Sequence, residues 1–168
     1  MSDGVLQKAI ECLRVSDIWQ RQASAQLSEY LEELGDLPES HDVLFKHVVL
    51  RSLWGKSEET EEAPYVFRVQ VGLGARFVES AKSSKEDGEP DIKSAPMLAQ
   101  IECVYVAEYL SDTDPGSDAL KAFALENASY HIWPYWREYL ATQCLRMNLP
   151  KVNLPLRSFA SNQAENPK

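Results

Sequence analysis

The stretch that decides the fold is YVFRVQVGLGARFV, residues 65–78. Apolar side chains stand at every second position from Tyr65 to Phe77, and the alternate positions hold mostly arginine, glutamine and glycine. Successive side chains of a strand point to opposite faces of a sheet. The stretch therefore predicts a β-strand with one buried face. It places Gly72 and Gly74 on the other face, where they mark a bulge or the close approach of another backbone.

Two further stretches predict strands beside this one. Residues 97–110 alternate in the same way, with apolar side chains at the odd positions. The polar residues 79–96 predict a long surface loop between these two strands, which we expect to pair antiparallel. Residues 43–54 are rich in β-branched and aromatic side chains at both parities. We therefore expect both faces of that strand to be at least partly covered.

The first part of the chain is less decisive. Residues 1–13 predict a short helix with Asp3 as its N-cap. Within residues 14–34, Trp19, Ala23 and Leu27 fit both the spacing of a helix and the parity of a strand, so the periodicity leaves both structures open. Residues 35–42 have the composition of a loop.

The second half of the chain predicts one dominant helix over residues 117–148, capped by Ser117 or Asp114. Pro134 should kink this helix or start a second segment, because proline lacks an amide donor. Residues 149–159 predict an extended segment, and residues 160–168 a frayed tail. Strands followed by a helix give an α+β fold with an antiparallel sheet, in a single domain over residues 1–168.

The charge balance excludes several classes of partner. The chain holds 17 lysines and arginines against 26 aspartates and glutamates, a net charge of −9. This balance argues against binding to nucleic-acid backbones and to anionic membranes. No stretch approaches the roughly 20 apolar residues that a spanning helix needs. Without a signal-peptide pattern at the start, we expect a soluble, cytoplasmic protein.

The sequence shows none of the residue patterns typical of a catalytic, metal or cofactor site. The Gly72-Leu73-Gly74 pattern lacks the third glycine and the following helix of a dinucleotide site. The three histidines and three cysteines show no metal-ligand or redox spacing. The acidic cluster in residues 58–62 lacks the pattern of a calcium loop, and we interpret Arg137 and Glu138 as a structural ion pair. We therefore expect no catalytic residue, no metal and no cofactor.

Aromatic side chains crowd one part of the long helix. Consecutive helical side chains diverge by about 100°, so five aromatic residues within ten positions cannot share one stripe. Such a helix must be covered on more than one side, either within one monomer core or between subunits. The small sheet covers one side only, which favours an oligomer. The residues expected in this helix core or oligomer interface are Tyr130, Trp133, Tyr135, Trp136, Tyr139 and Leu140.

Two motifs stand out in the second half of the chain, WPYWRE at residues 133–138 and LPKVNLPLRSF at residues 149–159. The first looks like the aromatic-Pro-Tyr-x-Arg-Glu helix motif of the SecB chaperone family, and the second resembles the extended segment that follows that helix in SecB. The match covers residues 97–159, and its motif residues are Pro134, Tyr135, Arg137, Glu138, Pro150, Asn153, Leu154 and Phe159.

The resemblance implies a fold and an assembly. SecB-like proteins have four antiparallel strands before the long helix, so residues 14–28 would be the first strand, with long loops at 29–42 and 79–96. Asp17-Ile18-Trp19 and the acidic loop resemble the SecB-like branch linked to toxin–antitoxin systems. The family implies a homotetramer. In SecB a further helix follows the matched Phe159, and we expect it to be short or absent here, which departs from the tail that contacts the SecA motor.

The activity that the resemblance implies is ATP-independent holding of unfolded or nascent chains, for export or to protect an antitoxin. The possible partners are therefore such clients, the SecA motor or an antitoxin. An exposed apolar groove would bind clients by area and main-chain hydrogen bonds, and the negative charge would favour basic clients. By position, the client contacts would be Tyr30, Leu31, Leu34, Leu37, Val152, Leu154 and Leu156, each of which could equally be loop packing. The alternatives are a SecB-fold adaptor for one folded partner and, last, a small enzyme.

Overall fold

The computed structural model describes residues 2–56, 58, 60–80 and 94–154. It contains four strands and four helices, in the order α1 (Ser2–Cys12), β1 (Arg14–Leu27), α2 (Glu29–Leu34), β2 (His41–Lys56), β3 (Tyr65–Glu79), β4 (Met97–Ser111), α3 (Ser117–Glu126) and α4 (Ala128–Arg146). Four antiparallel strands followed by helices confirm the α+β prediction. Within residues 14–34, β1 and the short helix α2 resolve the ambiguity.

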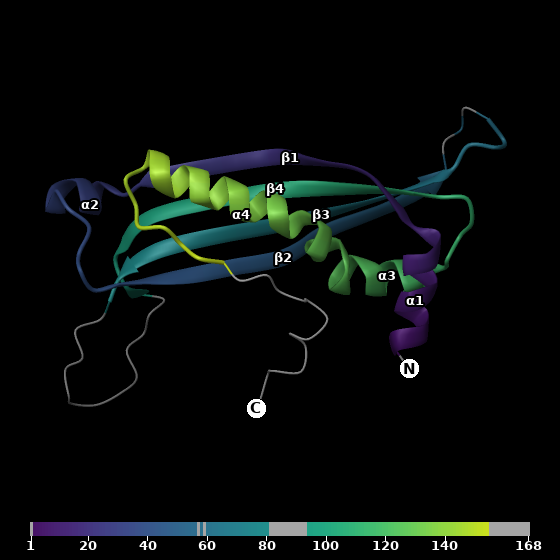
Figure 1. The fold of residues 1–168 in the computed structure, drawn as a ribbon, viewed down its shortest axis with the longest axis horizontal. Coiled ribbons are helices and arrows are strands. Elements are labelled where there is room, and N and C mark those ends of the chain that lie inside the picture. The colour runs from purple at the N-terminus through teal and green to yellow at the C-terminus, as the bar shows by residue number, and fades with distance from the viewer. Residues whose placement is uncertain (1, 57, 59, 81–93, 155–168) are drawn as a thin grey trace.

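The strands form one antiparallel sheet in the order β1-β4-β3-β2 (Figure 1). β2, β3 and β4 are consecutive neighbours, and β1 lies beside β4, which is a Greek-key arrangement. β1 and β2 are therefore the edge strands. The pairing register of β1 shifts at Ser16 and Arg21, and that of β2 shifts at Leu50, so each edge strand carries at least one bulge.

One face of the sheet carries the helices, and we call it the helix face. The odd-numbered side chains of β3 from Phe67 to Phe77 point into this face and are almost completely buried. They pair with odd-numbered residues of β4, from Ala99 to Tyr109. Figure 1 shows α4 lying across this face, with α3 and α1 together at one end. The apolar residues that the alternating pattern places on one face of the strands therefore form the core of the protein.

The long helix is interrupted seven residues before its proline. α3 ends and α4 begins at Asn127, whose φ of −115° departs from helical values. Pro134 lies inside α4 and its side chain is exposed. The prediction that Pro134 would start a second segment is therefore wrong as to the place of the break. A proline within a helix removes one amide donor and need not end the helix.

Two local predictions also need correction. Residues 29–34, expected within a loop, form α2, because the Ser28 hydroxyl accepts a hydrogen bond from the Leu31 amide at 3.1 Å and caps the helix. β2 was expected to be at least partly covered on both faces; Val43, Val49 and Trp54 are partly buried against the core, and as an edge strand β2 leaves much of the rest of its apolar surface exposed. Phe45 is 56% exposed on the helix face, and Leu50 is 50% exposed on the opposite face.

The opposite face of the sheet, which we call the outer face, holds Gly72 and Gly74 as predicted. Gly72 pairs with Val48 on one side and Val104 on the other, and Gly74 pairs with Lys46 and Glu102. β3 has no bulge at these positions, since the register shift against β4 is at Phe77 and Val78, and the shift against β2 is at Leu50, opposite Gln70 and Val71. Instead, side chains from the neighbouring strands lean over the two glycines, and a Cβ atom at Gly72 would meet Leu50 and Val48 at 3.2 Å.

Candidate functional site

Three polar contacts tie α4 and its N-terminal turn to the sheet. His47 Nε2 lies 2.6 Å from the Ser129 hydroxyl oxygen, and His131 Nδ1 lies 3.0 Å from the Tyr109 hydroxyl oxygen. The Tyr105 hydroxyl donates to the main-chain oxygen of Tyr135 at 3.2 Å. Burial lowers the pKa of both histidines. These contacts hold the helix in register with the sheet.

The pair formed by His47 and Ser129 is the start of a hydrolytic arrangement, in which histidine activates a serine hydroxyl. Ser129, however, is only 2% exposed, at the start of α4 and beneath its turn. A substrate carbonyl cannot reach a hydroxyl buried in this way. The pair is therefore structural in this chain.

The structure places the two predicted client-binding regions apart. Figure 1 shows that the segment after α4 begins at the end of the sheet that carries α2 and then runs back toward the middle, where residues 151–154 lie along α4 rather than beside α2. Tyr30 and Leu34 are 36% and 45% exposed. The Tyr30 hydroxyl donates to Glu79 at 2.6 Å, and this bond raises the pKa of Tyr30.

The remaining predicted client residues differ in how accessible they are. Leu37 and Val152 are partly buried against the core, whereas Leu31 and Leu154 are buried within it. Leu156 lies outside the described residues. In the single chain, the accessible apolar groups of this region are therefore Tyr30 and Leu34. They are joined by Leu27 at the end of β1, which is 39% exposed and was not predicted. We call these three residues the α2 patch.

The aromatic cluster of α4 divides into two sets. Trp133, Trp136 and Leu140 are 8%, 1% and 0% exposed and pack into the core. Tyr139 is partly buried, whereas Tyr130 and Tyr135 are 56% and 45% exposed. Leu145, near the end of α4, is 82% exposed. The helix therefore buries one side against the sheet and presents apolar groups on other sides.

The two family-like motifs meet across one groove. Pro134, Arg137 and Glu138 of α4 face residues 151–154 of the extended segment around a space of about 450 Å³. The Thr142 hydroxyl donates to Glu138 at 3.0 Å. Pro150 is exposed just before this segment, Tyr135 is not among the lining residues, and Phe159 lies outside the described residues. Residues far apart in the two motifs are thus neighbours in space.

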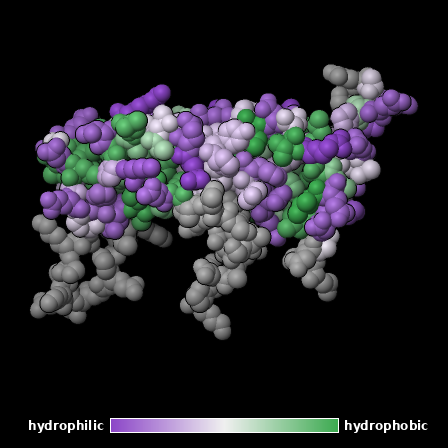
Figure 2. Space-filling model, in the orientation of Figure 1, coloured by the Kyte–Doolittle hydropathy of each residue, from purple (hydrophilic) through white to green (hydrophobic). Residues whose placement is uncertain are grey.

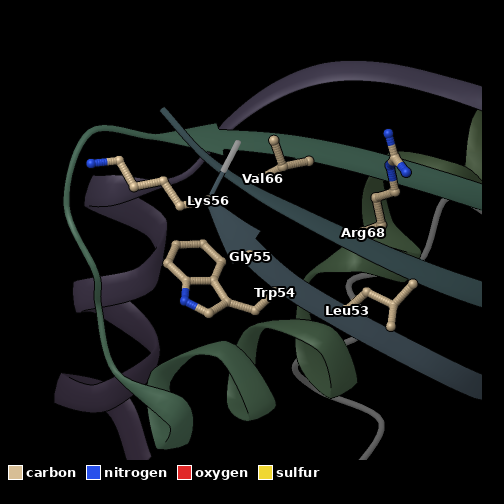
Figure 3. Close-up of a pocket in the computed structure, with 6 residues that line it drawn as sticks. All are labelled: Leu53, Trp54, Gly55, Lys56, Val66 and Arg68. Atoms are coloured by element: carbon tan, nitrogen blue, oxygen red, sulfur yellow. The ribbon is translucent and has the colours of Figure 1, made fainter. Parts of the chain in front are cut away.

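Sequence reasoning missed the exposed apolar residues of β2. Figure 2 shows hydrophobic surface toward both ends of the side that carries α4. On the outer face, Leu53, Val66 and Arg68 help to line a hollow of about 390 Å³ formed by the adjacent ends of β2 and β3 (Figure 3). The sequence did show apolar residues at both odd and even positions of residues 43–54. These residues are exposed because β2 lies at the edge of the sheet, and the sequence does not specify that position.

Two kinds of site are absent from the part of the chain that the structure describes. No group of three or more histidine, cysteine, aspartate or glutamate side chains there could hold a metal ion. Among the same residues, no helix has both the length and the hydropathy needed to cross a bilayer.

Comparisons with known proteins identify the fold. No protein-family model matches the chain, and no curated protein is significantly similar to it in sequence. A search of solved structures finds the Mycobacterium tuberculosis Rv1957 SecB-like chaperone, in complex with a ChAD peptide from the Rv1956 HigA1 antitoxin. The TM-score is 0.62 and the identity 18%, over 93% of this chain and 98% of that chain.

A protein of unknown function from Streptococcus agalactiae also matches, with a TM-score of 0.37 and 8% identity over 85% of this chain and 96% of that chain. The first match covers nearly all of both chains. The chain therefore has the α+β fold of a SecB-like chaperone.

Proposed function

We propose that this protein is an ATP-independent chaperone that holds extended segments of unfolded polypeptides, without catalysis. The observation that carries the proposal is the α2 patch (Leu27, Tyr30 and Leu34), an exposed apolar surface anchored to a well-packed core. Its three side chains are between 36% and 45% exposed, although Leu31 between them is buried. An exposed apolar patch on a folded protein marks a surface to which a partner binds.

The position of the patch supports an extended partner. α2 follows directly from the edge strand β1, and the Leu31 amide in its first turn already donates a hydrogen bond to the Ser28 hydroxyl. A peptide lying along this end would meet both apolar side chains and the main-chain groups of an edge strand. This combination gives affinity with little demand on sequence.

The SecB-like fold adds a second line of support. The solved SecB-like chaperone is in complex with a peptide from an antitoxin, so this fold accommodates a polypeptide segment. For the present chain, we extend the proposal to clients of the same physical kind, namely unfolded or nascent chains in the cytoplasm, for export or, in an antitoxin, for protection. The neighbour's complex with one antitoxin peptide also favours a second candidate function, that of an adaptor for a single partner.

We further propose that the protein assembles as a homotetramer. Three apolar side chains of α4 are exposed in the single chain, namely Tyr130, Tyr135 and Leu145. The same side of α4 in another copy of the chain would cover them. Aromatic residues are enriched in the buried centres of such interfaces.

The test of the chaperone proposal is light scattering while a denatured, aggregation-prone protein refolds, without nucleotide. We expect suppression near one tetramer per client, with two unrelated clients. Leu34→Ser should reduce the suppression, whereas Leu125→Ser, on α3 and 49% exposed, should not. Suppression of neither client would remove the general chaperone and leave the adaptor. Equal loss in both variants would show that the α2 patch is not the client surface.

A further inference from the structure

The outer face of the sheet carries a groove that neither the core nor the α2 patch explains. Gly72 and Gly74 have no side chains, so the surface sinks along the middle of β3. One hollow of about 120 Å³ is lined by residues that include Leu50, Gly72 and Val104. A second, of about 220 Å³, is lined by residues that include Gly74 and Arg76. Lys46 and Glu102 line both hollows, and we call the two together the outer-face groove.

The charge around this groove is opposite to that of the whole protein. The chain carries a net charge of −9. On the outer face, the strands place six basic side chains and four carboxylates. The basic residues are Arg14, Arg21, Lys46, Arg51, Arg68 and Arg76, and the acidic residues are Asp17, Asp42, Glu102 and Glu108. Asp112, just after β4, forms an ion pair with Arg14 at 3.0 Å, so the six basic side chains stand against five carboxylates and the face has a small positive charge on an anionic molecule.

Part of this positive charge is not neutralised within the protein. Lys46 pairs with Glu102 at 3.4 Å, and Arg68 pairs with Glu108 at 2.7 Å. Arg21 donates to the amide oxygen of Gln70 at 2.8 Å. Arg51 and Arg76 are exposed and form no ion pair with another described residue within 4.0 Å. These two arginines stand on adjacent strands, β2 and β3, along the groove.

The floor of the groove is apolar and narrow. Leu50 is 50% exposed beside it, and Val104 is partly buried beneath it. Side chains of Leu50 and Val48 lean over Gly72, and the Lys46–Glu102 pair lies over Gly74, so a ligand would contact these side chains rather than the backbone of β3. The apolar floor and the cationic rim together fit an extended polypeptide that carries both apolar and acidic side chains.

We propose that the outer-face groove binds an extended acidic segment of a partner polypeptide. The surface suits a peptide better than a nucleic acid, because its cations alternate with carboxylates and its floor offers apolar contacts rather than a continuous row of phosphate contacts. The proposal goes beyond the holding of unfolded clients, and it lies on the opposite face from α4. The proposal can therefore be tested independently of the chaperone proposal.

The test uses the full-length protein and a fluorescent nine-residue peptide in which valine and glutamate alternate, followed by fluorescence anisotropy. A second peptide has lysine in place of each glutamate, and a third probe is a short single-stranded DNA. We expect the glutamate peptide to bind at least tenfold more tightly than the lysine peptide, and binding to weaken as salt is added.

Two variants locate the binding. The double variant Arg51→Glu with Arg76→Glu should weaken binding of the glutamate peptide at least tenfold. The matched control, Lys8→Glu with Lys121→Glu, makes the same change in net charge on exposed positions of α1 and α3 and should leave the affinity within twofold. Gly74→Val, which fills the groove without changing charge, should also weaken binding, and circular dichroism checks that each variant is folded.

Several results would overturn the proposal. Equal binding of the two peptides, or equal loss in the control pair, would show that no acidic segment is recognised by this face. Tighter binding of the DNA would assign the face to nucleic acid instead. An excess of unlabelled glutamate peptide should leave suppression of client aggregation intact. Relief of that suppression would place the peptide on the client surface and overturn the assignment to the groove.

Discussion

Lys46 and Glu102 form an ion pair at 3.4 Å although a whole strand separates them. They belong to β2 and β4, and Gly74 of β3 lies directly between them in the register. The pair can close only because the intervening residue has no side chain. Both partners remain accessible, with 58% and 34% of their side chains exposed, so the pair contributes little to stability.

Gly74→Val tests this arrangement by separating the two partners. The new Cβ would lie 3.2 Å from Glu102 Cγ, which can shift by a few tenths of an ångström, and 3.4 Å from Lys46 Cβ, which is an ordinary van der Waals contact. The higher strand propensity of valine offsets the lost contact, so we expect the free energy of unfolding to stay within about 1 kcal/mol of the native value. Gly116→Val is the contrast, because Gly116 has a φ of +94°. It should destabilise by at least about 1 kcal/mol in urea unfolding, and the reverse ranking would contradict the model of the groove.

Phe77→Ala and Phe45→Ala make the same substitution on the same face of the sheet. Phe77 is 0% exposed and packs near His41, whereas Phe45 is 56% exposed on the edge strand. We expect Phe77→Ala to lower the free energy of unfolding by about 3–5 kcal/mol, and Phe45→Ala to change it by less than about 1 kcal/mol. Urea unfolding followed by tryptophan fluorescence measures both. Similar losses would mean that β2 is covered in solution.

Leu145→Glu tests the proposed assembly through α4. Leu145 is 82% exposed in the single chain, and a carboxylate in a buried contact between copies would be costly. We expect the variant to run as a smaller species in light scattering coupled to gel filtration. Leu53→Glu, on the outer face and 41% exposed, should leave the mass unchanged. An unchanged mass for Leu145→Glu would exclude this surface as the interface.

Acidification should destabilise the contacts between α4 and the sheet. Burial lowers the pKa of His47 and of His131 below the ordinary value of 6.5, so the folded protein favours their neutral forms. Their contribution to stability is present above pH 6.5 and is lost as pH falls through the lowered folded-state values. We expect the midpoint of thermal unfolding to fall between pH 7 and pH 5. The fall should be smaller in the double variant His47→Gln with His131→Gln, and an identical pH profile would assign the effect to other groups.

The three cysteines should differ in reactivity. Burial, and secondarily the charge of Glu102, raises the pKa of Cys103 to about 12, and burial also raises that of Cys144. A thiol reacts as its thiolate, so both should be inert in the folded protein. Cys12 is only partly buried. We expect a thiol reagent to label one cysteine per chain rapidly and the other two only after denaturation, with Cys12→Ser removing the rapid phase.

The sequence alone predicted the parts of this fold that depend on periodicity. The odd-numbered residues of β3 and β4 alternate so regularly that only one buried face fits them, and the structure confirms this. The first strand could not be assigned in the same way, because an edge strand leaves most of β1 exposed and removes the apolar signal. Its assignment required the resemblance to SecB.

The helix break and α2 depend on contacts that periodicity does not contain. The interruption at Asn127 involves no proline or glycine, and α2 depends on one serine cap. Pro134, the stronger local signal, lies on an exposed side of α4 where one missing hydrogen bond is tolerated. The outer-face groove could be foreseen only in part. Gly72 and Gly74 were placed correctly, but the basic residues around them come from three strands, β1, β2 and β3, and meet only once the strand order is known.

The bulges in the edge strands limit how far another chain can extend this sheet. β1 is interrupted at Ser16 and Arg21, and β2 at Leu50, so neither edge offers an unbroken row of hydrogen-bonding groups over its whole length. A protein that holds unfolded chains meets many segments able to add as a further strand, and an unbroken edge would seed fibril growth. Interrupted edges confine any added strand to a short ladder. Capture of a chain at such an edge then stays reversible, and release competes with growth of an aggregate.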